Sequence, residues 1–468
     1  MKLGRRDLGI GVAASFAASS ARAAPREAAN LGEAARVAAL GLIPYYEMYA
    51  TRWADTVDET NPQRMRLNRL IHEPRAGTSQ SVAGAVPDAD TLTSRAWLAL
   101  ELDPMFLTPP DMGARFYSFA LLDMSGRTFA QISSRLSGST PPPQAIVGPR
   151  WKGSIANDVV AVRAPGNVVL LQGQIEIGPA GDVATARSWQ RRTLLETPEM
   201  RNERRILEVR ELMRSAVKLP QEPVAEWVAP EPANPFDLFE VGARVLPEAP
   251  LAESDAELLA ALHDLRLRPG RRYDWRAFDR DDREIMLEGI ERAWTEVHEA
   301  VERFATASNG WQWLHPPTDA GASDRLYRAT RSAVTLADSE PEEMIVAMCS
   351  NDSAGRPLRG DASYLIRIEA DMAPVAKGFW SLAALVRTAD GTLKVPAGEA
   401  PAKLRDRTLR KSSDGAVEIR LQPDPPAGAA TSNWLRSGSG AICLAWRIHQ
   451  PSEDLLAGRL RLPAVERA

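Results

Sequence analysis

The side chains best suited to chemistry gather early in the chain, where carboxylates, arginines and hydroxyls alternate with apolar residues. Asp88 and Asp90 stand one residue apart, just before a strand-like run that begins near Thr91. An arginine beside carboxylates can hold an anionic substrate while an aspartate acts as a base. This pattern predicts catalytic roles for Asp90, Arg115 and Asp123.

The same polar set has a structural interpretation, in which it forms an ion-pair network and Asp90 caps a turn through backbone N–H groups. Two carboxylates on one side of an extended stretch repel each other, so a nearby cation is expected. Arg115, on a following strand, is the predicted partner of Asp90. If the set instead lines a site, the expected ligand contacts in this region are Asp88, Thr91, Tyr117 and Arg135.

A second candidate lies near the C-terminus, where aromatic residues stand beside an amide. Trp380, Asn433 and Trp434 can form a platform for a sugar or an apolar ligand. The chain has 12 tryptophans in all, so ordinary packing is the alternative for this trio.

Several common signatures are missing after the first 23 residues. The sequence there has no G-x-S-x-G, H-E-x-x-H, G-x-x-x-x-G-K-[ST] or C-x-x-C motif and no dinucleotide fingerprint. None of the five histidines is paired at ligand spacing, and Asp88 with Asp90 supplies too few oxygens for calcium. We therefore expect no metal and no cofactor. An enzyme of this kind would be a hydrolase or lyase that uses Asp and Arg.

Length and charge limit the classes of partner. A chain of 468 residues with 44% hydrophobic residues can bury more than one core, which favours two or three domains. The formal net charge of −4 argues against a nucleic-acid partner.

Residues 1–23 predict an export signal, with a charged start, a weakly hydrophobic Ala/Gly-rich middle and small residues up to Ala23. The pair Arg5-Arg6 resembles a twin-arginine signal, with an ordinary secretory signal as the alternative. No other apolar run approaches the length of a membrane span. We expect cleavage near Ala23 and a periplasmic mature protein.

The periodicity along the rest of the chain changes twice. Helical spacing opens the mature chain, short alternating runs follow from Thr91, helical spacing returns from about Val183, and strand-length runs resume near Glu343. A proline-rich passage, residues 219–235, should connect elements at the surface. The predicted fold is multidomain α and β, with an antiparallel β domain, a helical middle and a C-terminal β-sandwich or jelly roll. The predicted boundaries are 1–23 (signal), 28–190 (β domain with a leading helix), 191–325 (helical middle) and 326–468 (sandwich).

Short motifs in both β regions make the chain resemble a bacterial two-module family. Residues 87–94 stand in a P-N-x-D-T-L-Y-S element, with Asp88 for Asn and Thr93 for Tyr, and 173–174 read Gly-Gln where Gly-Arg is usual. Residues 378–382 and 432–435 match the second module. The chain is similar to proteins that join domain of unknown function 1254 to domain of unknown function 1214. That resemblance implies a β–α–β order and a tendency to form homo-oligomers, and it carries no agreed reaction.

Together these features predict an exported protein that binds a small organic or saccharide ligand in a pocket formed with its β domains, and that hydrolyses or cleaves it if it is an enzyme. The alternatives are a non-catalytic envelope protein that assembles through its β surfaces, and a binding module that delivers a ligand to another protein.

Overall fold

The computed structural model describes residues 25–73, 86, 88, 90–178, 182–206, 228–249, 251, 255–316, 322–336, 339–372, 374–388, 393–396, 403–428 and 433–468. The predicted export signal lies outside these residues. Of the proline-rich passage, the described part contains neither helix nor strand between residues 228 and 236. No helix in the described ranges is long and apolar enough to cross a membrane.

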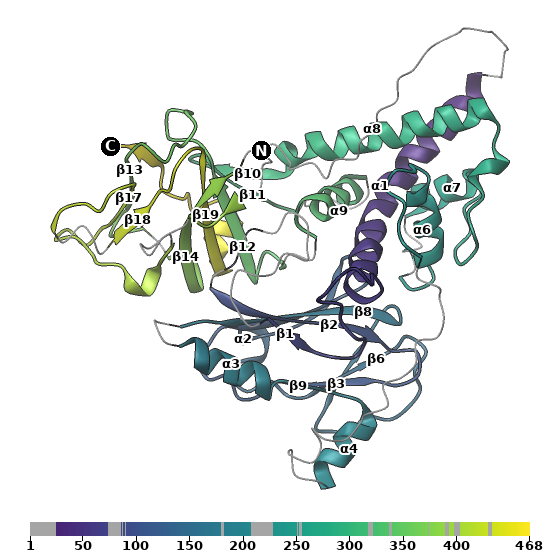
Figure 1. The fold of residues 1–468 in the computed structure, drawn as a ribbon, viewed down its shortest axis with the longest axis horizontal. Helices are drawn as coiled ribbons and strands as arrows, with labels where there is room; N and C mark the ends of the chain where they lie inside the picture. Colours follow the sequence, from purple (N-terminus) through teal and green to yellow (C-terminus); the bar gives the residue numbers. More distant parts are fainter. Residues whose placement is uncertain are drawn as a thin grey trace.

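The fold combines two β modules with a layer of helices, and this mixed α and β composition confirms the predicted fold class (Figure 1). The N-terminal β module contains a five-stranded antiparallel sheet. Its strands, in order across the sheet, are β1 (Ile71–His72), β2 (Thr91–Ala99), β8 (Val168–Glu176), β4 (Tyr117–Leu122) and β5 (Thr128–Ser133).

A second, four-stranded sheet completes the N-terminal module. Its strands are β7 (Val160–Arg163), β6 (Gln144–Val147), β3 (Met105–Thr108) and β9 (Leu194–Glu196). Of the module's three short helices, α4 (Pro198–Ile206) contacts this sheet, whereas α2 (Ser134–Ser137) and α3 (Val183–Arg192) contact the five-stranded sheet. Alternate residues of the larger sheet, such as Leu98, Phe119 and Leu171, share one core with the smaller sheet. The opposite face of the larger sheet points away from this core and contacts helices and the C-terminal part of the chain.

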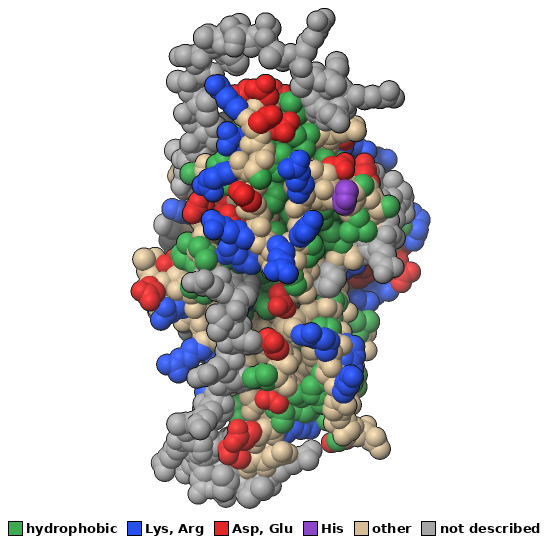
Figure 2. All heavy atoms as spheres, turned by 90° about the vertical axis from the view of Figure 1, so that its right-hand side faces the viewer, with side chains coloured by type: hydrophobic (Ala, Val, Ile, Leu, Met, Phe, Trp, Pro, Cys, Tyr) green, Lys and Arg blue, Asp and Glu red, His purple; other side chains and the backbone are tan. Residues whose placement is uncertain are grey.

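The first described helix, α1, packs against helices that follow the N-terminal module. The layer contains α1 (Pro25–Thr56), α6 (Asp237–Val245), α7 (Ala256–Asp264), the short η1 (Trp275–Ala277), α8 (Arg280–Phe304) and α9 (Ala322–Thr335). These helices share a core that also takes in Trp97 and Leu170 from the free sheet face. Figure 2 shows one side of the molecule, where acidic and basic side chains are interspersed with hydrophobic ones.

Two features of α1 and α8 explain their close packing. α1 continues through Pro44 as one element. Gly289 of α8 lies so close to α1 that a Cβ there would stand 2.2 Å from the carbonyl oxygen of Gly32. A glycine at this position therefore lets the two helix backbones touch.

The C-terminal module also has two sheets around one core. The larger contains β10 (Ala305–Ser308), β11 (Trp311–Leu314), β12 (Met344–Cys349), β19 (Ile442–Pro451), β14 (Ala376–Arg387) and β15 (Leu393–Lys394), with β16 (Lys403–Arg405) also paired to β14. The smaller contains β18 (Trp434–Arg436), β17 (Val417–Gln422), β13 (Tyr364–Ile368) and β20 (Val465–Arg467). Two short helices, η2 (Asp406–Thr408) and α10 (Glu453–Leu456), complete the module.

Strands β10 and β11 fall in a range that the sequence predicts to be helical. Trp311 and Trp313 alternate into the C-terminal core, and β11 pairs with β12. This pairing joins the end of α8 to the C-terminal sheet, so the long helix connects two parts of the fold.

Candidate functional site

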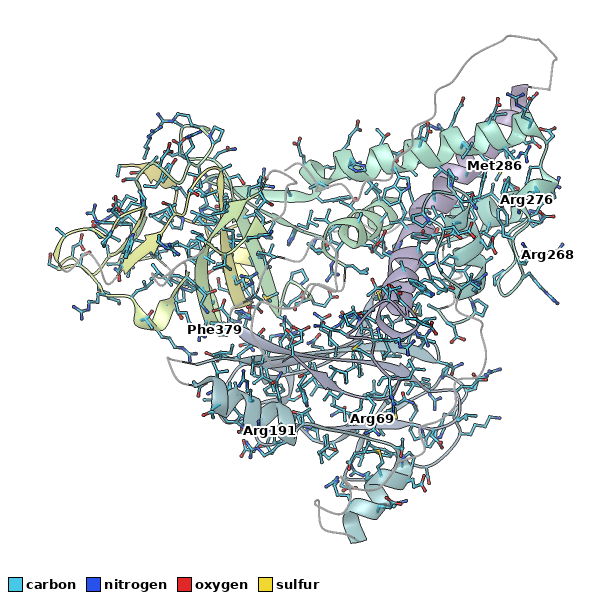
Figure 3. The ribbon with its side chains drawn as sticks, in the orientation of Figure 1. Arg69, Arg191, Arg268, Arg276, Met286 and Phe379 are labelled. Carbon is cyan, nitrogen blue, oxygen red and sulfur yellow. The ribbon has the colours of Figure 1, made fainter. Side chains whose placement is uncertain are left out.

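One face of the large C-terminal sheet meets the N-terminal module, and strand register fixes which residues lie on it. Trp446 of β19 and its partner Leu382 of β14 belong to the C-terminal core, so neighbouring positions point the other way. Figure 3 labels Phe379 where this face meets the N-terminal sheet. Directly paired residues share a face. The residues on this junction face are Phe379, Ser381, Lys403, Arg405, Arg447 and His449.

Asp90 is the acidic centre of the contact between the two modules. Its side chain is fully buried, and it accepts hydrogen bonds from Lys403 Nζ at 2.7 Å and from the hydroxyl of Ser381. Burial alone would raise the pKa of Asp90, but Lys403 and the nearby Arg447 hold it below its usual value. Asp90 is therefore an ionised partner in a buried salt bridge.

The predicted pairing of Asp90 with Arg115 is wrong. Arg115 precedes β4 at the edge of the contact and donates to the carboxylate of Asp182 and, at 2.6 Å, to the backbone carbonyl of Glu176. Its guanidinium also lies 4.3 Å from the ring centre of Trp189. The cation that offsets the negative charge of Asp90 is instead Lys403, which lies more than 300 residues later in the sequence.

Asp88, rather than Asp90, caps the turn that leads into β2. Asp88 accepts from the backbone N–H of Asp90 at 2.7 Å and from the hydroxyl of Thr91 at 2.6 Å. Arg447 lies 3.8 Å from Asp88 and donates to the carbonyl of Val86 at 2.7 Å. The turn that contains Asp88 and Asp90 therefore caps the start of β2 and also contacts the C-terminal module.

A second buried carboxylate, Glu176, repeats this arrangement at the end of β8. It accepts from Arg405 at 2.7 Å and from the backbone N–H of Phe116 at 3.2 Å, and Arg407 lies at 3.4 Å. The sequence analysis did not select Glu176, Lys403, Arg405 or Arg447. A carboxylate at the end of a strand that begins with four apolar residues was the available signal for Glu176.

The remaining candidates of the N-terminal module have structural partners. Asp123 lies in the turn between β4 and β5, where it accepts from the N–H of Ser125 at 2.8 Å and from its hydroxyl at 2.6 Å. Tyr117 donates to the carbonyl of Gly138 at 2.8 Å, and burial raises its pKa to about 12. Neither side chain contacts Asp90.

The aromatic candidates of the C-terminal module also have separate partners. Trp380 packs edge-on against Trp446 with ring centres 5.0 Å apart. The amide of Asn433 makes two hydrogen bonds with the backbone of Arg410, and the indole N–H of Trp434 donates to the carbonyl of Gln422 at 3.0 Å. These contacts hold loops to strands.

His449 lies between aromatic rings at the centre of the contact. Its ring stacks on Phe379 at 4.1 Å and meets Phe116 at 4.7 Å. The side chain is fully buried, and neither ring nitrogen has a hydrogen-bond partner among the described residues. The pKa of His449 is lowered to about 4, chiefly by burial; Asp88 and Asp90 oppose this shift, and Arg447 and Arg405 add to it.

A strip of polar side chains crosses the free face of the five-stranded sheet. Strand register aligns two rows on this face, and we call their polar members the polar strip: Thr93, Gln174, Ser118 and Ser133 in the first row, and Arg95, Gln172 and Gln131 in the second. On one side of the strip, Trp97 and Leu170 enter the core of the helical layer. On the other side, Phe116 and Glu176 contact the C-terminal module.

The polar strip contains hydrogen-bond acceptors that have no donor among the described residues. The Oε1 atoms of Gln131, Gln172 and Gln174 are buried, and within the described ranges none has a partner. The amide nitrogen of Gln131 donates to Ser118 at 2.5 Å. Such atoms are rare in folded proteins because leaving a buried polar group unpaired costs about 1–3 kcal/mol.

Glu343 connects the strip to the C-terminal module. It is fully buried and accepts from Ser133 and Arg135, each at 2.8 Å. Gln450, next to His449, donates through its backbone to the carbonyl of Glu343 at 2.7 Å and through its side chain to Ser134 at 2.8 Å. Arg135, predicted to contact a ligand, therefore holds the two modules together beside the strip.

These groups favour hydrogen bonding over metal chemistry. In the part of the chain that the structure describes, no three His, Cys, Asp or Glu side chains converge as metal ligands. Cys349 and Cys443 are buried free thiols. The strip offers amide and hydroxyl groups, which recognise neutral polar molecules.

We expect Asp90→Ala to destabilise the protein by about 3 kcal/mol, because it removes the buried carboxylate that pairs with the partly buried Lys403 ammonium. Adding Lys403→Met should recover part of that loss, and a double-mutant cycle in which each variant is unfolded with urea would measure the recovery. Asp414→Ala, which breaks an exposed ion pair with Arg367, is the matched control and should cost far less. Equal losses for Asp90→Ala and Asp414→Ala would contradict the structural role of Asp90.

We expect acid to weaken the fold through His449. Its pKa is about 4 when folded and 6.5 when unfolded, so the unfolded chain binds more protons between these values and stability falls as pH drops through this window. The full effect is about 3 kcal/mol. Unfolding midpoints measured at pH 7 and pH 4.5 should show that His449→Phe loses less stability on acidification than the wild type does. His263→Phe, at an exposed position, should change nothing; an acid loss unaltered by His449→Phe would refute the assignment.

The comparison with one solved protein structure agrees with this architecture. The crystal structure of the VPA0106 protein from Vibrio parahaemolyticus has a TM-score of 0.69 at 19% identity, and the match covers 94% of this chain and 100% of that one. A putative uncharacterized protein from Burkholderia cenocepacia matches with a TM-score of 0.43 at 11% identity over 95% of each chain. No curated protein matches.

Two family descriptions cover the two β modules. Residues 67–197 match "Protein of unknown function (DUF1254)", and residues 343–453 match "Protein of unknown function (DUF1214)". The first range contains Asp90, Glu176 and the β-strand residues of the polar strip, and the second contains Glu343, Ser381 and His449. The chain therefore belongs to the bacterial two-module family that joins DUF1254 to DUF1214.

Proposed function

We propose that this protein binds a small ligand rich in hydroxyl groups, of the saccharide class, at the polar strip. The observation that carries the proposal is the set of three glutamine Oε1 atoms, from Gln131 of β5 and from Gln172 and Gln174 of β8, which are buried on either side of β4 without a described partner. Hydroxyl donors of a ligand satisfy such acceptors. The helical layer borders the strip on one side and the C-terminal module on the other, so both modules contribute to the binding region.

The ion pairs favour binding over catalysis. A catalytic base near neutral pH needs a pKa close to the operating pH. The pKa of Asp90 is lowered, and the carboxylate is occupied by Lys403 and Ser381. Arg115 is likewise occupied by Asp182. We therefore leave hydrolysis and bond cleavage out of the proposed function.

The binding proposal can be tested by thermal unfolding of the purified protein with glucose, galactose, sucrose or maltose at millimolar concentration. A ligand that binds only the folded state raises the melting temperature with concentration. Gln172→Met with Gln174→Met keeps the side-chain size and removes both amides, so this variant should fold and lose the shift.

Gln422→Met is the matched control, because Gln422 lies in the smaller C-terminal sheet. This control should keep the wild-type response. The absence of a shift with all four sugars, or an undiminished shift in the strip variant, would overturn the proposal.

We propose further that the protein is exported to the periplasm by the twin-arginine route. The support is the pair Arg5-Arg6 ahead of a weakly hydrophobic segment and of small residues that end at Ala23. In a host with this pathway, Arg5→Lys combined with Arg6→Lys should retain the protein in the cytoplasm, as cell fractionation would show. Unchanged secretion in cells that lack the twin-arginine translocase would contradict the route.

A further inference from the structure

The connection between α7 and α8 carries an unusual concentration of positive charge. Residues 266–276 contain five arginines and a single acidic residue, Asp274, although the whole chain has a net charge of −4. We call these arginines the basic connection: Arg266, Arg268, Arg271, Arg272 and Arg276. All five are exposed, and among the described residues none has an ion-pair partner.

The backbone of the basic connection is held in place by the residues between its arginines. Leu265, Leu267 and Tyr273 are buried in the core of the helical layer. Gly270, at a φ of +71°, donates its backbone N–H to the carbonyl of Ala243 at 2.7 Å. Because alternate residues anchor the segment, the arginines project outward from a fixed backbone, which lowers the entropy lost on binding.

The basic connection lies at the end of the helical layer remote from the C-terminal sheets. Figure 3 labels Arg268 and Arg276 there, and the face turned toward the viewer in Figure 2 shows Lys and Arg side chains gathered over the helices. Trp275 is stacked on Phe236 at 5.1 Å, with the guanidinium of Arg276 4.2 Å from its ring centre. The Trp275 ring is therefore already occupied by Phe236 and Arg276.

We infer that the basic connection docks the protein onto an anionic phospholipid bilayer. Each basic residue near such a surface adds a similar electrostatic attraction, and several can act together on a broad array of phosphates. A nucleic acid fits the observations less well, since single strands need open aromatic rings for base stacking and the Trp275 ring is already occupied. A long polyanion would also meet the acidic residues that follow, Asp279, Asp281 and Glu284.

The test is co-sedimentation of the purified full chain with vesicles of phosphatidylglycerol and phosphatidylcholine, compared with vesicles of phosphatidylcholine alone. The chain should bind the anionic vesicles, release them as salt rises, and ignore the neutral ones. Arg271→Gln with Arg272→Gln should weaken partitioning by about tenfold or more. Every variant is otherwise identical, so the difference between variants reports on the altered arginines.

Arg191→Gln with Arg192→Gln is the matched control, because it removes two adjacent exposed arginines from the end of α3. This control should bind like wild type. Equal weakening in both variants, no weakening in the first, or no binding to anionic vesicles would overturn the inference. So would tight binding of a single-stranded oligonucleotide that Arg271→Gln with Arg272→Gln abolishes.

Discussion

The buried pairing of Asp90 with Lys403 and Ser381 is the interaction on which the arrangement of the two β modules depends. Taking charges out of water is costly, so each buried charge at this contact requires an opposite charge or a hydrogen-bond donor nearby. Asp90 meets that requirement through Lys403 and Ser381 of the C-terminal module, and Glu176, which also accepts from the backbone N–H of Phe116, obtains its cation Arg405 from that module. This dependence makes the contact specific, because shifting or rotating one module relative to the other would leave carboxylates and guanidinium groups buried without partners.

The polar strip is bordered by two very different surfaces. On one side Trp97 and Leu170 pack into an apolar core with α1 and α8, where area buried from water supplies the stability. On the other side Glu176, Glu343 and His449 form a charged and aromatic contact. The strip occupies the sheet face between these surfaces, and the glutamine oxygens without a partner among the described residues lie there.

Local sequence patterns predicted the elements better than the contacts between them. Alternation identified strands such as β2 and β8, but not β10 and β11, which fall in the range predicted to be helical. The predicted partner of Asp90 was Arg115, because that residue is close in sequence, whereas the partner in the structure is Lys403. Lys403 lies in a three-residue strand that no short pattern distinguishes. The role of His449 depends on Phe116, which is 333 positions earlier, and no single-sequence pattern connects residues so far apart.

The sequence separation across this contact also has a consequence for folding order. Ser381 and Arg447 meet partners that were synthesised 291 and 361 residues earlier. Contacts of such long range form late, after the entropy of closing very large loops has been overcome. The N-terminal module must therefore emerge from the ribosome with Asp90 and Glu176 still hydrated. The two modules can lock together only after the long strand β19, which carries Arg447 and His449, has been added.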